Sequence, residues 1–476
     1  MARGGLDQKI FFSVALASAF FAIGFGFISG KIFVTELADW GNDAHEYIAT
    51  GLELARHHRF HAEDSLFFGP FQKGPGYPLF LAGIFETVGE SAVLVWLGHI
   101  ALWICSLWLL WKISQRFLKG RLSLLPPLFL GFYWGAAVYV IDINSDLLAL
   151  FLVLLLVYAS IKYQEEKKFA LILVAAFSLG FLILVKPITL YFTPIYAALL
   201  YLGVRHPSTH PSTINSEVGL PNRERNYGSP TPVMRHLLVF LAIVGILAGS
   251  WSYYNYKLIG TPQLASGGLT LMRRADDVNM SAERIGAFTL ASAFGDYIAD
   301  KFFPGYAAAP EPYTAFSSAR EKNYYRRQLP SKKNELVLQQ EQYAEARKLI
   351  AAHPVKFVFS SLIYVLRLNN PVNHRSVELI HTFVGTRGSI PEFVKIGFLV
   401  SAHLAWLIFV GTVIYMLFRS LKDWRNRGII LFLILYFNGM YALLTHAEAR
   451  YILPVIPFYF LLLALFLAPF LERKLT

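Results

Sequence analysis

The chain is poor in the features that mark a soluble or secreted protein. Only 16% of its 476 residues are charged, and it has a single cysteine, Cys105. A soluble globular chain carries about 25% charged residues, so an ordinary soluble fold is excluded. One cysteine cannot form an intrachain disulfide. The first apolar run, 10–30, is too long for the h-region of a signal peptide, and no small-residue cleavage site follows it.

Long apolar segments dominate what is present. Hydrophobic residues make up 55% of the chain, and the mean hydropathy is +0.46. Apolar runs of about 18–25 residues recur, which is the length needed to cross a bilayer. The sequence predicts an all-α polytopic membrane protein with about ten transmembrane helices and extracytoplasmic loop helices. The predicted spans are 10–31, 91–111, 123–141, 145–161, 169–185, 188–204, 236–256, 394–418, 428–445 and 451–470.

Basic residues set the predicted orientation. The short connections 112–121, 162–168 and 419–427 are rich in Lys and Arg and fall on one side of the membrane with both termini. That side is cytoplasmic by the positive-inside rule. The net charge of +12 is then explained by contact with anionic membrane lipids, and no nucleic-acid partner is expected.

The chain divides into three predicted parts. Residues 1–260 form an N-terminal transmembrane catalytic module with an extracytoplasmic loop at 32–90 and a polar cytoplasmic linker at 203–235. Residues 261–393 form an extracytoplasmic segment, and residues 394–476 form the C-terminal transmembrane helices. Within 261–393, a polar helix is predicted at 331–350. An apolar helix at 354–368 is too short for a span and is placed at the membrane interface.

Ionisable residues collect at the predicted extracytoplasmic ends of the spans. Charge next to the hydrocarbon core is costly and is usually retained for function. The alternative is that helix ends are polar anyway and that Lys and Arg side chains snorkel to water. The short turns that carry several of these residues favour a shared functional site. The residues are Asp43, Glu46, Asp142, Asp146, Lys186, Glu448 and Arg450.

Asp43 opens a helical run with an apolar stripe of Ala44, Ile48, Leu52 and Ala55. Asp is a good N-cap residue, so capping is one explanation for it. The functional alternative is a general base in a partly dry cleft.

The run from Lys73 to Pro78 predicts a rigid re-entry into the membrane. Pro75 and Pro78 fix φ, and Gly76 permits a sharp bend. Tyr77 suits the membrane interface. Lys73 beside this bend is either part of a rigid loop or a contact for phosphate.

A metal site is a weaker interpretation of the stretch 57–64, which precedes this run. His57, His58, His61, Glu63 and Asp64 do not have the spacing of an established metal motif. Solvated side chains explain them better, and His61, Glu63 and Asp64 stay as weak candidate ligands for a divalent metal ion.

Taken in order, several motifs resemble those of the GT-C glycosyltransferases, in the branch of the protein O-mannosyltransferases and the lipid A aminoarabinose transferase. The resemblance covers residues 1–260 and 350–470. It is carried by Asp43 with Tyr47, Lys73-Gly-Pro-Gly-Tyr77-Pro-Leu-Phe-Leu-Ala82, Asp142-Ile-Asn-Ser-Asp146, Val185-Lys186-Pro187, Trp251-Ser-Tyr-Tyr254-Asn255-Tyr256, Ala352-His353-Pro354 and Glu448-Ala-Arg450-Tyr451.

The resemblance implies a GT-C-like fold and an integral protein of a prokaryotic plasma membrane. It implies transfer of a sugar from a polyprenyl-phosphate donor, with inversion, to a lipid, glycan or protein acceptor on the extracytoplasmic face. Asp43 would be the base, and Lys73, Lys186 and Arg450 would bind the donor phosphate. The other implied substrate-binding residues are Glu46, Tyr47, Tyr77, Asp146, Tyr254, Asn255 and Glu448.

The chain departs from the family pattern at several positions. Lys73, Lys186 and Tyr254 stand where Arg is common, and Ala44 replaces the second acid of a frequent acidic pair. These departures leave a divalent metal cofactor undecided, and no other cofactor is expected. A polytopic transporter or lipid flippase and a lipid-linked glycan ligase are the alternative functions. A transporter is disfavoured because no convincing internal repeat is visible.

Overall fold

All regular elements in the described part of the chain are helical. The structure, a computed structural model, describes residues 2–28, 30–37, 40, 42–60, 73–205, 230–265, 267–305, 332–370, 392–445 and 448–475. The predicted all-α fold is confirmed for these residues. The elements are α1 (Ala2–Ile28), η1 (Lys31–Phe33), α2 (Asn42–His57), α4 (Gly76–Thr87), α5 (Ala92–Ser114), η3 (Gly120–Leu124), α6 (Leu125–Gly131), α7 (Trp134–Ile141), α8 (Asp146–Glu166), α9 (Phe169–Val185), η4 (Pro187–Phe192), α10 (Thr193–Arg205), α11 (Pro230–Ile259), α12 (Gly268–Asp276), η5 (Asp277–Asn279), α13 (Ala282–Phe294), α14 (Asp296–Phe302), α16 (Lys332–Ala352), α17 (Pro354–Leu368), α19 (Glu392–Leu421), α20 (Trp424–Leu444), η6 (Ala449–Val455) and α21 (Ile456–Leu475).

Seven helices of the described ranges are long and apolar enough to cross a membrane, and up to nine spans result if each of two bent helix pairs counts as one. The prediction of a polytopic protein is confirmed, but the count of ten spans is not. The seven segments are Gly5–Phe27, Ala92–Ser114, Asp146–Glu166, Val233–Leu258, Leu399–Leu421, Asn426–Leu444 and Ala449–Arg473.

The three other predicted spans coincide with broken or short helices. The predicted span 123–141 is a helix pair, Gly120–Gly131 and Trp134–Ile141, bent by 61°. The predicted spans 169–185 and 188–204 are the shorter apolar helices Phe169–Val185 and Pro187–Leu202. A helix of the length of α9 rises by about 25 Å, less than the roughly 30 Å of a hydrocarbon core. The apolar runs located these helices correctly, but they did not reveal the break in 123–141.

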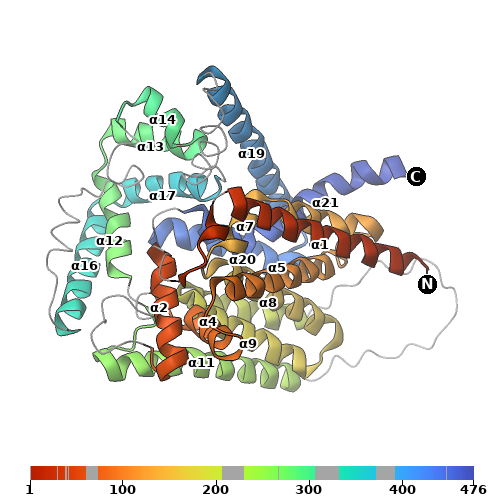
Figure 1. Cartoon of the computed structure of the whole chain (residues 1–476), viewed down its shortest axis with the longest axis horizontal. Coiled ribbons are helices and arrows are strands. Elements are labelled where there is room, and N and C mark those ends of the chain that lie inside the picture. Colours follow the sequence, from red (N-terminus) through yellow and green to blue (C-terminus); the bar gives the residue numbers. More distant parts are fainter. Residues whose placement is uncertain are drawn as a thin grey trace.

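Figure 1 shows how the helices are arranged. The apolar helices α1, α5, α8, α9 and α11 run lengthwise through the body. Both termini lie at one end, whereas α2, α12, α13, α14 and α16 gather at the opposite end. The charge pattern predicts that the termini and these segments lie on different faces of the membrane, and this orientation stays a prediction. The predicted linker 203–235 lies mostly outside the described residues.

α8 is the centre of the bundle. In its apolar stretch 78% of the residues are buried, against 17% for the stretch in α11. α8 packs against α5, α9 and η6. A helix that is apolar on all sides is stable when neighbours or lipid surround it completely. The peripheral α11 exposes apolar side chains such as Leu238 and Ile246, so lipid is the suitable surrounding for its outer face.

The segment after α11 contains the two predicted helices at 331–350 and 354–368. They are α16 and α17, and they meet at an angle of 103°. α17 buries Phe357 and Tyr364. Its other face exposes apolar side chains at the helical spacing of 355, 358, 359 and 362. An amphipathic helix with this pattern suits a position in the membrane interface.

A buried arginine connects this segment to the bundle. Arg274 on α12 is 0% exposed and lies over the rings of Phe357 and Tyr364. All five of its N–H groups donate a hydrogen bond, so the desolvated charge is fully compensated. The acceptors are Ala442 O (2.8 Å), Asp277 Oδ2 (3.1 Å), Ser360 Oγ (3.0 Å), Phe357 O (3.2 Å) and Ser361 Oγ. The guanidinium therefore joins α12, α17 and the end of α20.

Arg274→Ala is expected to destabilise the protein by roughly 3–5 kcal/mol, because it leaves the buried Asp277 carboxylate without its cation. The measurement is the apparent unfolding temperature of the purified protein in detergent. Arg56→Ala is the control, since Arg56 pairs with Glu90 at the surface, and it should shift that temperature little. Equal shifts in the two variants would contradict the stabilising role of the buried Arg274.

Candidate functional site

Helix α2 carries the first group of site residues. Its first two turns present Asp43, Glu46 and Tyr47, while Ala44 and Ile48 are buried. The predicted apolar stripe is thus confirmed at these positions. Carboxylates in the first turn also interact favourably with the helix dipole.

The Lys73–Gly76 loop lies directly on the C-terminal end of α9. A Cβ atom at Gly74 would lie 2.4 Å from the Leu184 carbonyl oxygen, and one at Gly76 would lie 2.7 Å from the Val185 nitrogen. Gly74 also has φ +86°, which glycine adopts without strain. The prediction for Gly76 was incomplete: Gly74 has the left-handed backbone, and Gly76 is needed for close packing. The two glycines bring Lys73 next to the segment that ends in Lys186.

Five charged side chains form one ion-pair network, called here the Asp43 cluster. Lys73 Nζ lies 2.7 Å from Asp43 Oδ1 and 2.7 Å from Glu46 Oε2. Arg450 Nη2 lies 2.8 Å from Asp43 Oδ2, and Arg450 Nε lies 2.5 Å from Glu448 Oε2. Asp43 therefore bridges two cations, and each of its oxygens contacts one. Three distant parts of the chain, namely α2, the loop before α4 and η6, meet at this carboxylate.

A second ion pair adjoins the Asp43 cluster. Lys186 Nζ lies 2.7 Å from Asp146 Oδ1, and Asp146 is fully buried at the start of α8. The ring of Tyr451 lies near both Lys186 and Arg450, at 5.9 and 5.4 Å from the charged groups. The hydroxyl of Tyr47 on α2 lies 3.1 Å from Oγ of Ser145, the residue before Asp146. Asp146 and Lys186 thus border the Asp43 cluster through these side chains.

A third pair joins Lys31 to Asp142. The sequence placed Asp142 in the charged set but did not single out Lys31. One signal could have drawn attention to Lys31. It follows the first predicted span on the side where the positive-inside rule disfavours lysine. The Lys31 ammonium also lies 5.7 Å from the centre of the Trp40 ring.

Tyr77 is buried beneath the site. Its hydroxyl lies 2.9 Å from His99 Nε2, and His99 Nδ1 lies 3.2 Å from Val140 O. A carbonyl oxygen only accepts, so Nδ1 donates to it and Nε2 accepts from Tyr77. The rings of Tyr77 and Tyr47 meet edge to face at 4.9 Å. Tyr77 therefore supports the position of Tyr47, and its hydroxyl is already used by His99.

The charges around Asp43 favour its ionised form. Burial alone would raise the pKa of Asp43, but the nearby Arg450 and Lys73 outweigh burial and lower it. Burial raises the pKa of Tyr47, so this hydroxyl stays protonated at neutral pH. The site thus holds an ionised carboxylate beside a neutral phenol.

Tyr254 and Asn255 lie in a different environment from the Asp43 cluster. Tyr254 stacks on Trp251 and meets Phe60, which follows the C-terminal end of α2. Asn255 Nδ2 donates to Gln263 O at 2.6 Å. From Asp43 to the end of α2 the helix rises by about 21 Å. The described contacts therefore do not bring these two residues to Asp43.

The metal-ligand candidates His61, Glu63 and Asp64 lie outside the described residues. Among the residues that are described, no group of three or more His, Cys, Asp or Glu side chains has metal-binding geometry. The carboxylates of the Asp43 cluster contact lysine and arginine instead.

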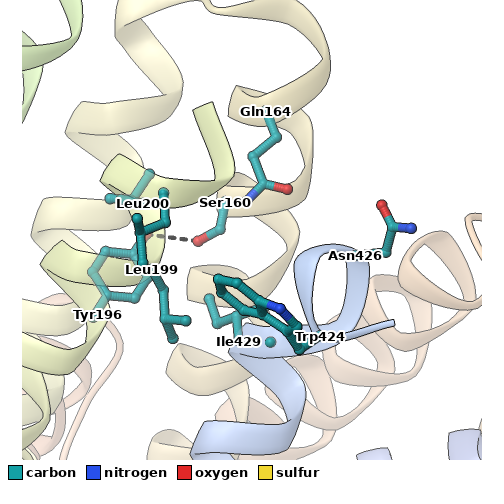
Figure 2. Close-up of a pocket in the computed structure, with 10 residues that line it drawn as sticks. Ser160, Gln164, Tyr196, Leu199, Leu200, Trp424, Asn426 and Ile429 are labelled. Atoms are coloured by element: carbon teal, nitrogen blue, oxygen red, sulfur yellow. Dashed lines mark hydrogen bonds between the residues drawn. The ribbon is translucent and has the colours of Figure 1, made fainter. Parts of the chain in front are cut away.

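A small pocket lies elsewhere in the bundle. Figure 2 shows it between α8, α10 and the beginning of α20, where Ser160 and Tyr196 share a hydrogen bond of 2.6 Å. Ser160 follows Asp146 by about 21 Å along α8. This pocket belongs to the other end of that helix and is not part of the charged site.

Comparisons with known proteins bear on part of the chain. The family described as dolichyl-phosphate-mannose-protein mannosyltransferase matches residues 72–215. A similar solved structure is the archaeal oligosaccharyltransferase AglB from Archaeoglobus fulgidus in complex with an inhibitory peptide and a dolichol-phosphate. It is 12% identical with a TM-score of 0.49, and the likeness covers 98% of this chain and 52% of that one. Nothing about the site rests on it. A search of curated protein sequences gave no match.

The family match covers Lys73, Tyr77, Asp146 and Lys186, whereas Asp43 and Arg450 lie outside it. The match confirms, for residues 72–215, the resemblance to GT-C glycosyltransferases that the loop motifs indicated.

Proposed function

We propose that the protein is an integral membrane glycosyltransferase that moves a sugar from a polyprenyl-phosphate donor to an acceptor hydroxyl on the extracytoplasmic face. The observation that carries this proposal is the Asp43 cluster, where a carboxylate and two cations from distant segments meet at the ends of the spans. The family match over residues 72–215 supports the same chemistry. The site also lies among segments that gather opposite both termini (Figure 1).

The donor phosphate needs cations close to the apolar boundary. Lys73, Arg450 and Lys186 supply them, and the rings of Tyr47 and Tyr451 lie beside these charged groups. Hydrogen bonds between such cations and a phosphate are stronger than neutral ones. The spans expose apolar side chains, which suits a polyprenyl chain that stays in lipid while its headgroup reaches the charges.

The acceptor needs a base, and Asp43 is the proposed one. The acceptor oxygen attacks C1 of the sugar on the side opposite the phosphate, and its proton passes to an Asp43 oxygen. The C1–O bond to phosphate breaks with its electron pair, so polyprenyl phosphate leaves and the sugar inverts at C1. The cations stabilise the negative charge that develops on the leaving phosphate.

The segment that contains α12, α16 and α17 is the proposed acceptor side. α17 packs on η6, which carries Arg450, and Arg274 connects α12 with the end of α20. A segment fixed beside the charged site in this way can select the acceptor.

Asp43→Asn is expected to lower the transfer rate by about 10²–10⁴-fold, because the amide cannot accept the acceptor proton. The measurement is release of polyprenyl phosphate from a polyprenyl-phosphate sugar by the purified protein. Expression, elution as a single species and unfolding temperature should match the wild type, since Lys73 and Arg450 keep their other carboxylates. Full turnover in this variant would exclude Asp43 as the base.

Lys186→Ala is expected to raise the KM for the donor by roughly 10–100-fold with little effect on the KM for the acceptor, because one charged contact to phosphate is lost. Since the change leaves the buried Asp146 uncompensated, Lys186→Met combined with Asp146→Asn is measured beside it. Equal effects on the two KM values in both proteins would argue against phosphate contact by Lys186.

The pH dependence of stability should report how far Lys73 and Arg450 stabilise the ionised Asp43 carboxylate. The folded-state pKa of this carboxyl is lowered, so the stabilisation is complete above its unfolded pKa of about 3.9 and is lost as the pH falls through the folded value. Wild type should therefore unfold at a higher temperature than Lys73→Met at pH 7, and the difference should shrink below about pH 4. A difference that stays constant down to pH 3 would contradict this assignment. The effect should be small, because the Asp43 side chain is 36% exposed.

A further inference from the structure

The cations proposed to bind phosphate are all occupied by carboxylates. Asp43 contacts both Lys73 and Arg450, Glu46 contacts Lys73, and Glu448 contacts Arg450. Lys186 is held by Asp146. Three cations thus face four carboxylates, and a donor phosphate would enter a site that already has an excess of negative charge. One carboxylate has to give way before phosphate can bind.

Asp43 is the carboxylate placed to do so. Its two oxygens contact two different cations, as two oxygens of a phosphate would. Glu46 and Glu448 each contact one cation, so either could remain in place and keep Lys73 or Arg450 oriented. Asp43 and Glu448 are each 36% exposed, whereas Asp146 is fully buried. Of these carboxylates, Asp43 contacts two of the cations, so its movement would release both Lys73 and Arg450.

We propose, on the basis of the proposed function, that Asp43 occupies the phosphate position when no donor is bound and that the donor phosphate displaces it from Lys73 and Arg450. The displaced carboxylate is then free to approach the acceptor hydroxyl. The base is thus held inactive by the same two cations that later bind the donor.

Displacement changes the surroundings of Asp43. In the structure, Asp43 faces Lys73 from the loop before α4 and Glu46 from its own helix. Arg450 and Tyr451 of η6 and Glu448 just before η6 also lie around it, with Tyr47 one turn away. Once a phosphate monoanion binds, the two cations face two glutamates and the phosphate, so the net charge beside Asp43 changes from zero to about −1. This change raises the pKa of Asp43. A carboxylate whose pKa approaches the working pH is a more effective base.

The same exchange would help the product to leave. After transfer, Asp43 carries the proton from the acceptor, and polyprenyl phosphate lies on the two cations. Loss of that proton restores a carboxylate that competes for Lys73 and Arg450. Asp43 would then act as an internal competitor of the product phosphate.

The test uses farnesyl methyl phosphate, a phosphodiester with an apolar tail and no sugar, so that binding occurs without transfer. Its affinity for the protein in lipid nanodiscs is measured by calorimetry at pH 6.5, in buffers with different ionisation enthalpies. Asp43→Asn should bind the probe roughly five- to tenfold more tightly than wild type, because a competing charge is removed. Wild type should take up more protons on binding than this variant.

Asp142→Asn is the matched control, since it removes a carboxylate paired with Lys31 at the same face without changing the Asp43 cluster. It should bind the probe as wild type does. Asp43→Ser, checked for an unchanged unfolding temperature, guards against an effect specific to the amide. Equal or weaker binding by both Asp43 variants, or equal proton uptake, would overturn the proposal.

Failure of this proposal can be distinguished from failure of the proposed function. A protein that transfers sugar but whose Asp43 variants bind the probe no more tightly retains the function without the displacement. A protein that shows tighter probe binding in the variants but no transfer retains the phosphate site without the glycosyltransferase activity. Absence of binding in wild type and variants alike would overturn both the phosphate site and the displacement.

Discussion

The contact on which the site depends is the carboxylate of Asp43 between Lys73 and Arg450. It joins α2, the loop before α4 and η6, three segments that the chain reaches at widely separated positions. None of these segments would hold its charge near lipid alone, because an unpaired ion is costly there. Mutual pairing makes the arrangement stable and at the same time leaves the cations occupied. The ion pairs that stabilise the site therefore use the same cations that an incoming anion would need.

Backbone packing determines where these charges lie. Gly74 and Gly76 let the loop rest on the end of α9, so Lys73 and Lys186 are brought together by main-chain contact. Side-chain rotamers then make only the last adjustments. Tyr47 continues the same connection through its hydrogen bond to Ser145 at the start of α8. The position of the charged groups is thus fixed by the central helix of the bundle.

The all-α fold and most of its apolar helices could be predicted from the sequence, because long apolar runs report directly on such helices. The grouping of Asp43, Lys73 and Arg450 also followed, since all were assigned to one face. Helix length and breaks were less accessible, as the bent pair at 120–141 shows. Neither the pairing of Lys31 with Asp142 nor the hydrogen bond of Asn255 to Gln263 could be predicted, because both depend on tertiary contacts that no local pattern encodes.

Arg274 has a practical consequence for handling the protein. Its guanidinium is enclosed by α12 and α17 and also bonds to Ala442 at the end of α20. Separating α12 and α17 from α20 would remove the Ala442 acceptor and leave one N–H group of a buried charge without its hydrogen bond. Residues 268–370 should therefore not be excised as a soluble fragment or exchanged between homologous chains as a cassette, and chimaeras should keep both sides of this contact from one parent.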